Sequence, residues 1–257
     1  MKIVVLIKEV PDTYGERHLV LATGRVDRAA GDAVVDEIDE RALEVALQLK
    51  DRAKDTEIVA IAMGPASAKD SLRKALQMGA DRAVHVLDDA LAGADALATA
   101  RALAAATQRE QPDLVLAGNE STDGRGGVVP AMIAEILGLP LAAGLGQVEI
   151  GPDAVRGTRT TDAAVTTLRA ALPAVVTVTE KSAEARFPGF KGVMAAKKKP
   201  TDVVSAAALG TDPAASTAVL TTSERPARAA GTAIEDDGTG GRQLAEWLVA
   251  RGLVVAR

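Results

Sequence analysis

The sequence predicts an α/β fold in which helices flank a mostly parallel β-sheet. Through roughly the first 140 residues, short apolar runs alternate with amphipathic segments, and the connections between them are short. Hydrophobic residues make up 47% of the 257-residue chain, but aromatic residues make up only 2%. The core must therefore consist of alanine, valine, leucine and isoleucine, which suits helices that cover a parallel sheet.

The individual elements of this fold follow from hydrophobic periodicity. Four apolar runs are expected to be buried strands, at residues 2–7, 57–63, 81–87 and 113–118. Four segments with apolar residues at helical spacing are expected to be helices, at residues 39–53, 66–80, 94–110 and 128–138. Gly79 is expected to end the second helix, because glycine readily adopts the conformation that closes many helices.

The pattern changes after residue 140. Short strands, some of them in hairpins, are expected at residues 147–151, 154–161, 164–172 and 174–180, extending the sheet. The α/β core is then expected to cover residues 1–183, followed by a loop and lysine-rich segment at 184–200. Residues 201–257 are rich in alanine, threonine, serine and proline and end in one amphipathic helix. Such a C-terminal arm buries little apolar surface by itself, so we expect it to pack on a partner chain.

Composition excludes several classes of function. The net charge of −5 argues against a general nucleic-acid binder, which needs a basic face. The chain has no cysteine and only two histidines, so disulfides, thiolate metal sites and cysteine nucleophiles are excluded, and we expect no metal site. The N-terminal apolar run is too short for a signal peptide or a membrane span. We therefore expect a cytoplasmic protein with no membrane insertion.

The loop "GNESTDGRGGVV", residues 118–129, is the first candidate binding site. It follows an expected strand and precedes an expected helix, where ligands of open α/β sheets bind. Its glycines allow close backbone approach, its hydroxyl groups can donate hydrogen bonds, and the free N–H groups of the helix start favour an anion such as phosphate. An ordinary β–α turn explains the glycines equally well. The loop matches neither a Walker motif nor the dinucleotide fingerprint, because Val129 stands where the third glycine would be.

A cluster of acids at the start of the first expected helix is the second candidate. Helix capping and interaction with the helix dipole are the favoured interpretation of Asp36, Glu37 and Asp39. The alternative is that a carboxylate there accepts hydrogen bonds from an adenine amino group or a ribose hydroxyl.

The segment "EARFPGFKGVMAAKKKP", residues 184–200, is the third candidate. It contains both phenylalanines of the chain, Phe187 and Phe190, beside Pro188 and Gly189, which predict a loop. Either the loop folds back and buries both rings, or it protrudes and offers an apolar contact to another protein. The run of lysines at 197–199 is typical of a solvated face.

Motifs spread over the whole chain resemble the beta subunit of the electron transfer flavoproteins, and the variants are most similar to actinobacterial members. The matching motifs are "KIVVLIKEVPDT", "DEIDERALEVAL", "MGPASAKDSLRKALQMGADRAVHV", "LVLAGNESTDGRGGVVPAMIAEILGLP" and "LPAVVTVTEKSAEARFPGFKGVMAAKKK". The resemblance implies a Rossmann-like sheet of the adenine nucleotide-binding type, with a C-terminal arm that embraces the alpha subunit.

The resemblance also implies a function. The family's alpha–beta heterodimers carry electrons from acyl-CoA dehydrogenases and related enzymes, as in fatty acid oxidation, to a membrane quinone oxidoreductase. The redox FAD lies mainly in the alpha subunit, and ordinary beta subunits hold a structural AMP. The beta subunit is an electron-carrier subunit without independent catalysis.

Motif matching carries the family's sites onto this chain residue by residue. The turn at Thr13 and Tyr14 would approach the flavin, and the segment with Phe187, Phe190, Lys191 and Met194 would dock the dehydrogenase. The residues implied to contact AMP are Leu6, Asp36, Glu37, Ile38, Asp39, Met63, Gly118, Asn119, Glu120, Ser121, Thr122, Asp123, Gly124, Arg125, Gly126, Gly127, Val128 and Val129.

Three alternatives stay open at this point. Electron-bifurcating relatives carry a second FAD in place of AMP, but their loop typically has an Asp-Gly-Asp-Thr-like run. Here Arg125 follows Asp123 and Gly124, which favours AMP, and the guanidinium could bind a phosphate directly. A nucleotide sensor of the universal-stress type or a nucleotide hydrolase would need neither the phenylalanine segment nor the arm.

Overall fold

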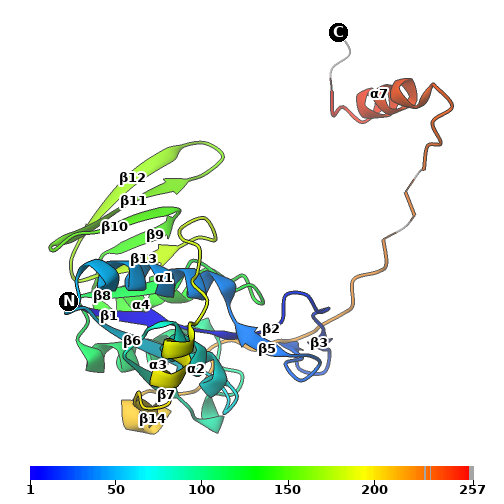
Figure 1. Cartoon of the computed structure of the whole chain (residues 1–257). Helices are drawn as coiled ribbons and strands as arrows, with labels where there is room; N and C mark the ends of the chain where they lie inside the picture. The colour runs from blue at the N-terminus through cyan, green and yellow to red at the C-terminus, as the bar shows by residue number, and fades with distance from the viewer. Residues whose placement is uncertain (229, 232, 255–257) are drawn as a thin grey trace. The chain divides into compact units, whose positions relative to one another are not determined.

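The computed structural model describes residues 1–228, 230–231 and 233–254. Its centre is a seven-stranded sheet in the order β14-β7-β6-β1-β8-β13-β9, and every neighbouring pair of strands is parallel. The strands are β1 (Lys2–Leu6), β6 (Glu57–Met63), β7 (Arg82–Val86), β8 (Leu114–Gly118), β9 (Leu141–Leu145), β13 (Ala174–Val178) and β14 (Thr201–Val204). The predicted α/β fold is confirmed (Figure 1).

Helices cover both faces of this sheet. They are α1 (Glu37–Arg52), α2 (Ala68–Met78), α3 (Ala96–Glu110) and α4 (Val129–Leu137). Successive residues of a strand point to opposite faces, so Ile3 and Val5 pack with α1 and α2, whereas Val4 and Leu6 pack with α3 and α4. Because the central strands are buried on both sides, their sequences are continuous apolar runs rather than alternating ones.

The boundaries of the predicted helices shift by a few residues. The first helix begins at Glu37 instead of residue 39, because the Asp36 side chain caps it by accepting a hydrogen bond from the Ile38 N–H. The predicted role of Gly79 is confirmed: it ends α2 with a φ of 144°, and its N–H donates to the carbonyl of Ala75.

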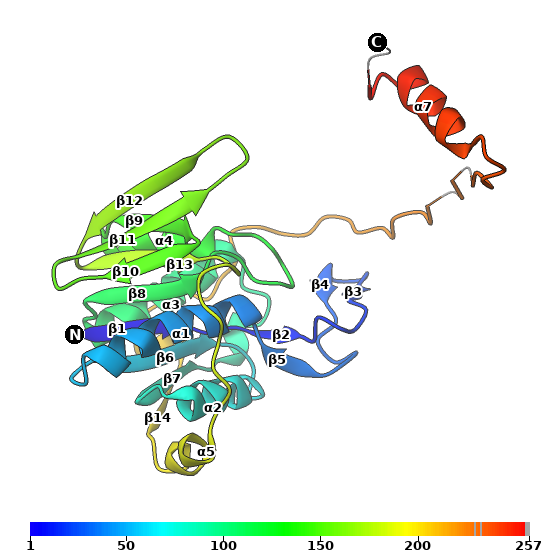
Figure 2. The ribbon, with the colours of Figure 1, turned by 45° about the horizontal axis from the view of Figure 1, so that its top comes forward.

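The expectation that all the later strands extend the central sheet is wrong. Of the four strands expected there, only β13 joins it, whereas β10 (Gln147–Ile150), β11 (Ala154–Thr160) and β12 (Val165–Ala171) form a separate antiparallel sheet beside β9 (Figures 1 and 2). Their sequences explain the difference. In β11 a buried Val155 and Gly157 flank the exposed Arg156, the one-sided pattern of an antiparallel sheet with a face toward water. In β13 every residue is buried.

The core continues past residue 201, where the C-terminal arm was expected to begin. Strand β14 pairs with β7 at the edge of the central sheet, and α6 (Ala206–Leu209) follows it with Ala206 buried. The first compact unit extends from Met1 to Thr222, and the second comprises Ser223–Arg257. In the second unit, helix α7 (Gly240–Ala250) has no buried residue. The first part of the predicted arm, residues 201–222, therefore belongs to the core and contributes a strand and a helix to it.

A small excursion leaves the sheet at the carboxyl end of β1. Strands β2 (Glu9–Pro11) and β5 (Ala33–Val35) pair antiparallel, and between them lies the hairpin of β3 (Leu19–Val20) and β4 (Arg25–Val26). Figure 2 shows both pairs beyond one end of the central strands. This excursion brings side chains from residues 9–35 to the edge where the loop after β8 lies.

Two truncations test the revised boundary. A chain that ends at Thr222 keeps the first unit and should unfold at the temperature of the full chain. A chain that ends at Pro200 loses β14, uncovers the edge of β7 and should melt several degrees lower, since 1 kcal/mol corresponds to about 2–4 °C in a domain of this size. Calorimetry or thermal circular dichroism measures the difference. Equal melting temperatures would show that residues 201–222 are dispensable for the core.

Candidate functional site

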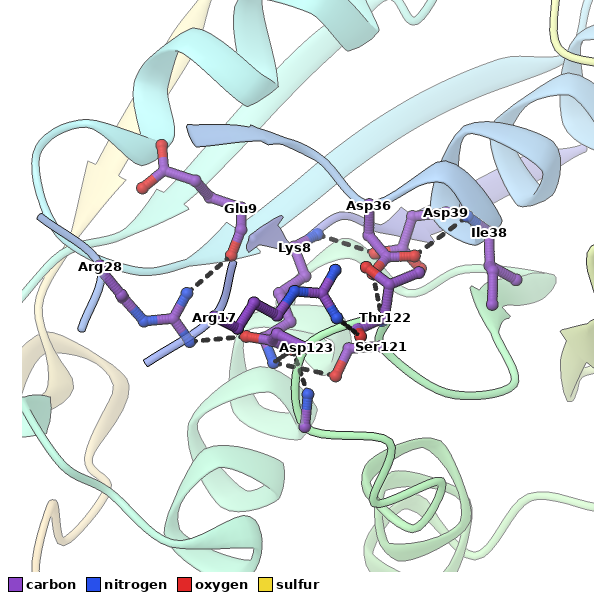
Figure 3. A network of polar contacts seen from close by, with 11 residues as sticks. Lys8, Glu9, Arg17, Arg28, Asp36, Ile38, Asp39, Ser121, Thr122 and Asp123 are labelled. Carbon is purple, nitrogen blue, oxygen red and sulfur yellow. Dashed lines mark hydrogen bonds and ion pairs between the residues drawn. The ribbon is translucent and has the colours of Figure 1, made fainter. Parts of the chain in front are cut away.

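The candidate site lies at the carboxyl ends of β1 and β8, the edge of a parallel sheet where ligands bind (Figure 3). Leu6 and Met63 end strands β1 and β6 there, Leu6 buried and Met63 half-buried. The start of α1 and the loop at residues 119–128 complete the edge. The structure thus brings together the two segments that the sequence marked separately, the acids at 36–39 and the glycine loop.

Asp36 joins the start of α1 to the loop. It is fully buried, and its Oδ1 accepts from the Ile38 N–H at 3.0 Å. Its Oδ2 accepts from both the N–H of Thr122, at 2.6 Å, and the hydroxyl of Thr122, at 2.8 Å. The favoured interpretation of Asp36 as a helix cap is confirmed, and the same carboxylate also fixes the position of the loop.

Asp39 joins α1 to the ends of two strands. Its Oδ2 accepts from the Lys8 N–H at 2.8 Å, and its Oδ1 accepts from the Gly118 N–H at 2.9 Å. Burial, and next the neighbouring Asp36 carboxylate, raise the pKa of Asp39 to about 8, although the two N–H groups oppose the shift. The third acid of the cluster, Glu37, is exposed.

Asp123 is the centre of a second network, which sequence reasoning missed. Lys8 Nζ donates to Asp123 Oδ1 at 2.7 Å and to Ser121 Oγ at 3.0 Å, and Arg28 Nη2 donates to Asp123 Oδ2 at 2.9 Å. Arg17 donates to the carbonyl of Thr122. The Asp123 side chain is only 1% exposed, and this burial alone would raise its pKa. Hydrogen bonds from Lys8 and Ser121 outweigh the effect of burial and hold the pKa of Asp123 well below its usual range.

The rest of the loop presents backbone rather than side chains. Residues 124–128 are exposed, and two of them have left-handed backbone, Arg125 at a φ of 48° and Gly127 at 63°. A Cβ added at Gly126 would meet no atom within 4 Å. Helix α4 starts without a side-chain cap at Val128, so its first N–H groups face the loop without a side-chain acceptor there. This combination of free N–H groups and accessible glycines suits an anion.

Asn119 supplies a further polar group at the same edge. It directly follows β8, and its N–H donates to the carbonyl of Val178. Its Oδ1 is buried and accepts no hydrogen bond from any of the described residues. A buried acceptor without a donor costs free energy, so this atom needs a donor that the described residues do not supply.

The turn with Thr13 and Tyr14 lies on the excursion between β2 and β5. Both residues are exposed, and Tyr14 is 98% exposed. Arg17 and Arg28, from the same excursion, hold residues 122 and 123 of the loop. The excursion that carries this turn is therefore connected by hydrogen bonds to the glycine loop, although the two segments lie far apart in the sequence.

The phenylalanine segment is exposed, so the interpretation with two buried rings is wrong for this chain. Phe187 is 95% exposed, Phe190 82% and Met194 48%, and Lys191 is exposed as well. The predicted loop is partly helical, since α5 (Phe190–Ala196) begins at Phe190 with Gly189 as its N-cap. The lysine run is not simply solvated either: Lys199 Nζ donates to the carbonyls of Leu76 and Ala80 at the end of α2.

Comparison with known proteins shows the class to which this fold and site belong. The model of the electron transfer flavoprotein domain matches residues 23–209. The chain is 47% identical to the electron transfer flavoprotein subunit beta of Mycobacterium tuberculosis, over 98% of this chain and 99% of the relative. It is 48% identical to that of Mycobacterium leprae over the same shares. It is 36% identical to that of Mus musculus, over 76% of this chain and 78% of the relative.

The chain therefore belongs to the electron transfer flavoprotein family, and these relatives are all named as its beta subunits. The resemblance inferred from the motifs is confirmed, including its similarity to actinobacterial members. Within the described residues, no helix has the length and apolar character needed to cross a lipid bilayer.

Gly118 tests the packing beneath the site. A Cβ at this position would lie 2.8 Å from Asp39 Oδ1 and 3.1 Å from Ile38 Cγ2. Gly118→Ala should therefore lower the free energy of unfolding by about 1–3 kcal/mol, the usual cost of overpacking. Urea unfolding measures this, with Gly126→Ala as the control because its position is open. A Gly118→Ala chain as stable as the control would contradict the described contact.

The raised pKa of Asp39 predicts a pH dependence of stability. The unfolded carboxyl has a pKa of about 3.9, so the folded chain holds an extra proton between pH ~4 and ~8. The contribution of Asp39 to stability is complete below pH ~4 and is lost as the pH rises toward 8. Asp39→Asn should flatten this decline, which urea unfolding at pH 5, 6.5 and 8 would measure. Asp123 does not interfere, because its lowered pKa matters only below this window. A constant difference between the two chains at all three pH values would refute the assignment.

Proposed function

We propose that this chain is the beta subunit of a heterodimeric electron transfer flavoprotein. The complex takes electrons from acyl-CoA dehydrogenases and related enzymes in the cytoplasm and passes them to a membrane quinone oxidoreductase. The near full-length similarity to beta subunits is the observation that carries the proposal. The chain has no independent catalytic activity and acts by binding nucleotide, alpha subunit and electron donor.

AMP is the proposed ligand of the loop at residues 118–129. Its phosphate would lie against the exposed glycines and the uncapped start of α4, with Arg125 beside it. The base or ribose would donate to the buried Oδ1 of Asn119. Since protein donors already occupy Asp36 and Asp39, we assign contacts at residues 36–39 to the surrounding backbone and to Ile38. A second FAD at this position, as in bifurcating relatives, is the alternative.

FAD held mainly by the alpha subunit would supply the redox chemistry of the complex. We propose that the exposed turn of Thr13 and Tyr14 covers the flavin from the beta side. The hydrogen bonds of Arg17 and Arg28 to the nucleotide loop would hold the excursion that carries this turn. In this account the AMP site has a structural role, because it fixes the part of the beta subunit that encloses the flavin.

The C-terminal helix α7 is the proposed contact with the alpha subunit. Its apolar residues Leu244 and Trp247 are 51% and 40% exposed within the chain, and the Arg251 guanidinium lies 4.3 Å from the centre of the Trp247 ring. An amphipathic helix with an exposed apolar face gains stability by packing on a partner. Dehydrogenases would dock on the segment with Phe187, Phe190, Lys191 and Met194.

The nucleotide content of the purified heterodimer tests the AMP assignment. Denaturation should release about one AMP and one FAD per heterodimer, identified by chromatography and mass spectrometry. Gly126→Val should lower the AMP content, because its side chain would stand where the phosphate approaches the backbone. Gly31→Val is the matched control, since both positions are open in the chain alone. Release of two FAD and no AMP would instead establish the bifurcating type.

Phe190→Ala tests dehydrogenase docking. A phenylalanine ring can bury on the order of 150 Å² against a partner. At ~25 cal/mol per Å², this contributes up to several kcal/mol before the cost of association. We expect the KM for the heterodimer in a dehydrogenase assay to rise roughly tenfold, since 1.4 kcal/mol is a factor of ten. The contents of flavin and AMP and the melting temperature should stay near wild type. An unchanged KM would contradict the docking role.

A further inference from the structure

We propose that Arg186 is a positioning residue, which holds the exposed Phe187 in place for the dehydrogenase through its bond to Glu44 on α1. The inference rests on the proposed docking function and extends it to residues that touch neither cofactor nor partner. It assigns a purpose to a partly buried ion pair outside the proposed nucleotide site. It also makes Phe187 a second docking residue, fixed independently of Phe190.

The contact between Arg186 and Glu44 is partly buried and bidentate. Arg186 Nε donates to Glu44 Oε2 at 2.7 Å, and its Nη2 donates to Oε1 at 2.8 Å. The backbone N–H of Arg186 also donates to Oε2, at 3.2 Å. The Glu44 side chain is 6% exposed, and Asp51, further along α1, accepts a second bond from Nη2 at 2.8 Å. A planar guanidinium held at both edges has a single orientation, which a lysine could not reproduce.

The segment held in this way has little other fixed structure. Residues 183–189 belong to no helix or strand, and Figure 2 shows the chain crossing α1 here on its way to α5. A second bond from the same helix, from Arg41 to the carbonyl of Ala183, fixes the beginning of the segment. Arg186 fixes the position immediately before Phe187. Helix α1, one of the most buried elements of the core, thus holds the segment at two positions.

A different helix holds the other side of the docking segment. Helix α5 packs on α2, and a Cβ added at Gly192 would lie 2.2 Å from the carbonyl oxygen of Gln77. Lys199 then bonds the carbonyls at the end of α2. Phe190, the first residue of α5, therefore depends on α2, whereas Phe187 depends on α1 through Arg186. The two rings form a docking surface held on two helices.

This arrangement points to docking because the bonds fix the backbone beside Phe187, a side chain that has no contact role within the chain. Phe187 is 95% exposed, so its position contributes nothing to the core. A partner that binds a ring on an already fixed backbone avoids the entropy cost of ordering that backbone. The occupant is an electron-donating dehydrogenase with an apolar pocket. Loss of the bond to Glu44 should raise the KM for the heterodimer by roughly three- to tenfold, the cost of ordering one or two residues on binding.

A double-mutant cycle in the intact heterodimer tests the inference. The variants are Glu44→Gln, Phe187→Ala and the two combined, assayed for KM and kcat with a dehydrogenase. Glu44→Gln should raise KM with kcat, flavin content and AMP content unchanged, and it should have no further effect once Phe187 is alanine. Glu110→Gln is the matched control, because it breaks another partly buried pair, with Arg82, outside the docking segment.

The outcomes separate the inference from the proposed function. An unchanged KM in Glu44→Gln, or an equal rise with and without Phe187, would overturn the positioning role of Arg186. If Phe190→Ala alone raises KM, the docking function stands even when the inference fails. If no phenylalanine variant raises KM, the docking function itself fails. Arg186→Lys provides the check on folding: it keeps the charge but loses the bidentate geometry, and it should raise KM as Glu44→Gln does.

Discussion

Two buried aspartates at the start of α1 determine how the candidate site is built. Asp36 and Asp39 together accept hydrogen bonds from the helix start, from the ends of β1 and β8, and from Thr122 in the loop. Buried carboxyl groups are stable only when hydrogen-bond partners surround them, so each of these segments is constrained to one position. The glycine loop can then present its backbone to a ligand, because its base is fixed elsewhere. Gly118 is required because no side chain fits against Asp39.

The proposed nucleotide site and the proposed docking segment are built on the same principle. In each, an exposed functional segment is held by buried polar bonds to α1, through Asp36 and Asp39 in one case and Glu44 in the other. Helix α1 is covered on one side by the sheet and offers acids on its remaining surface. In the proposed function the chain binds several partners transiently, and rigid surfaces reduce the entropy cost of each association.

The sequence predicts most of the sheet because β1, β6 and β8 are buried on both faces and therefore read as continuous apolar runs. It does not predict β14, whose four residues are largely exposed and which pairs with β7 at the edge of the sheet. The sequence predicts the strands of the antiparallel sheet but places them in the central sheet. The one-sided burial of β11 indicates a strand with one face toward water, but it does not indicate which strand pairs with it.

The site is predictable to a similar extent. The glycine loop and the acids at 36–39 can be recognised in the sequence, because glycines in turns and acids at helix starts are required by the local conformation of the backbone. Lys8, Arg17 and Arg28 are not, because their contacts with the loop span 115, 105 and 95 residues along the chain. No local pattern distinguishes these cations from solvated ones. The same holds for Arg186, whose partner Glu44 lies 142 residues away.

Amide hydrogen exchange at Thr122 tests the central claim most directly. If Asp36 holds the loop, the Thr122 N–H should exchange as slowly as amides of the core strands, although it lies in a loop, and far more slowly than the exposed Gly126. Asp36→Ala should abolish this protection and leave β6 unaffected. Exchange of Thr122 at the rate of Gly126 in the wild-type chain would show that the loop is not fixed by the carboxylate, and the account of the site would be contradicted.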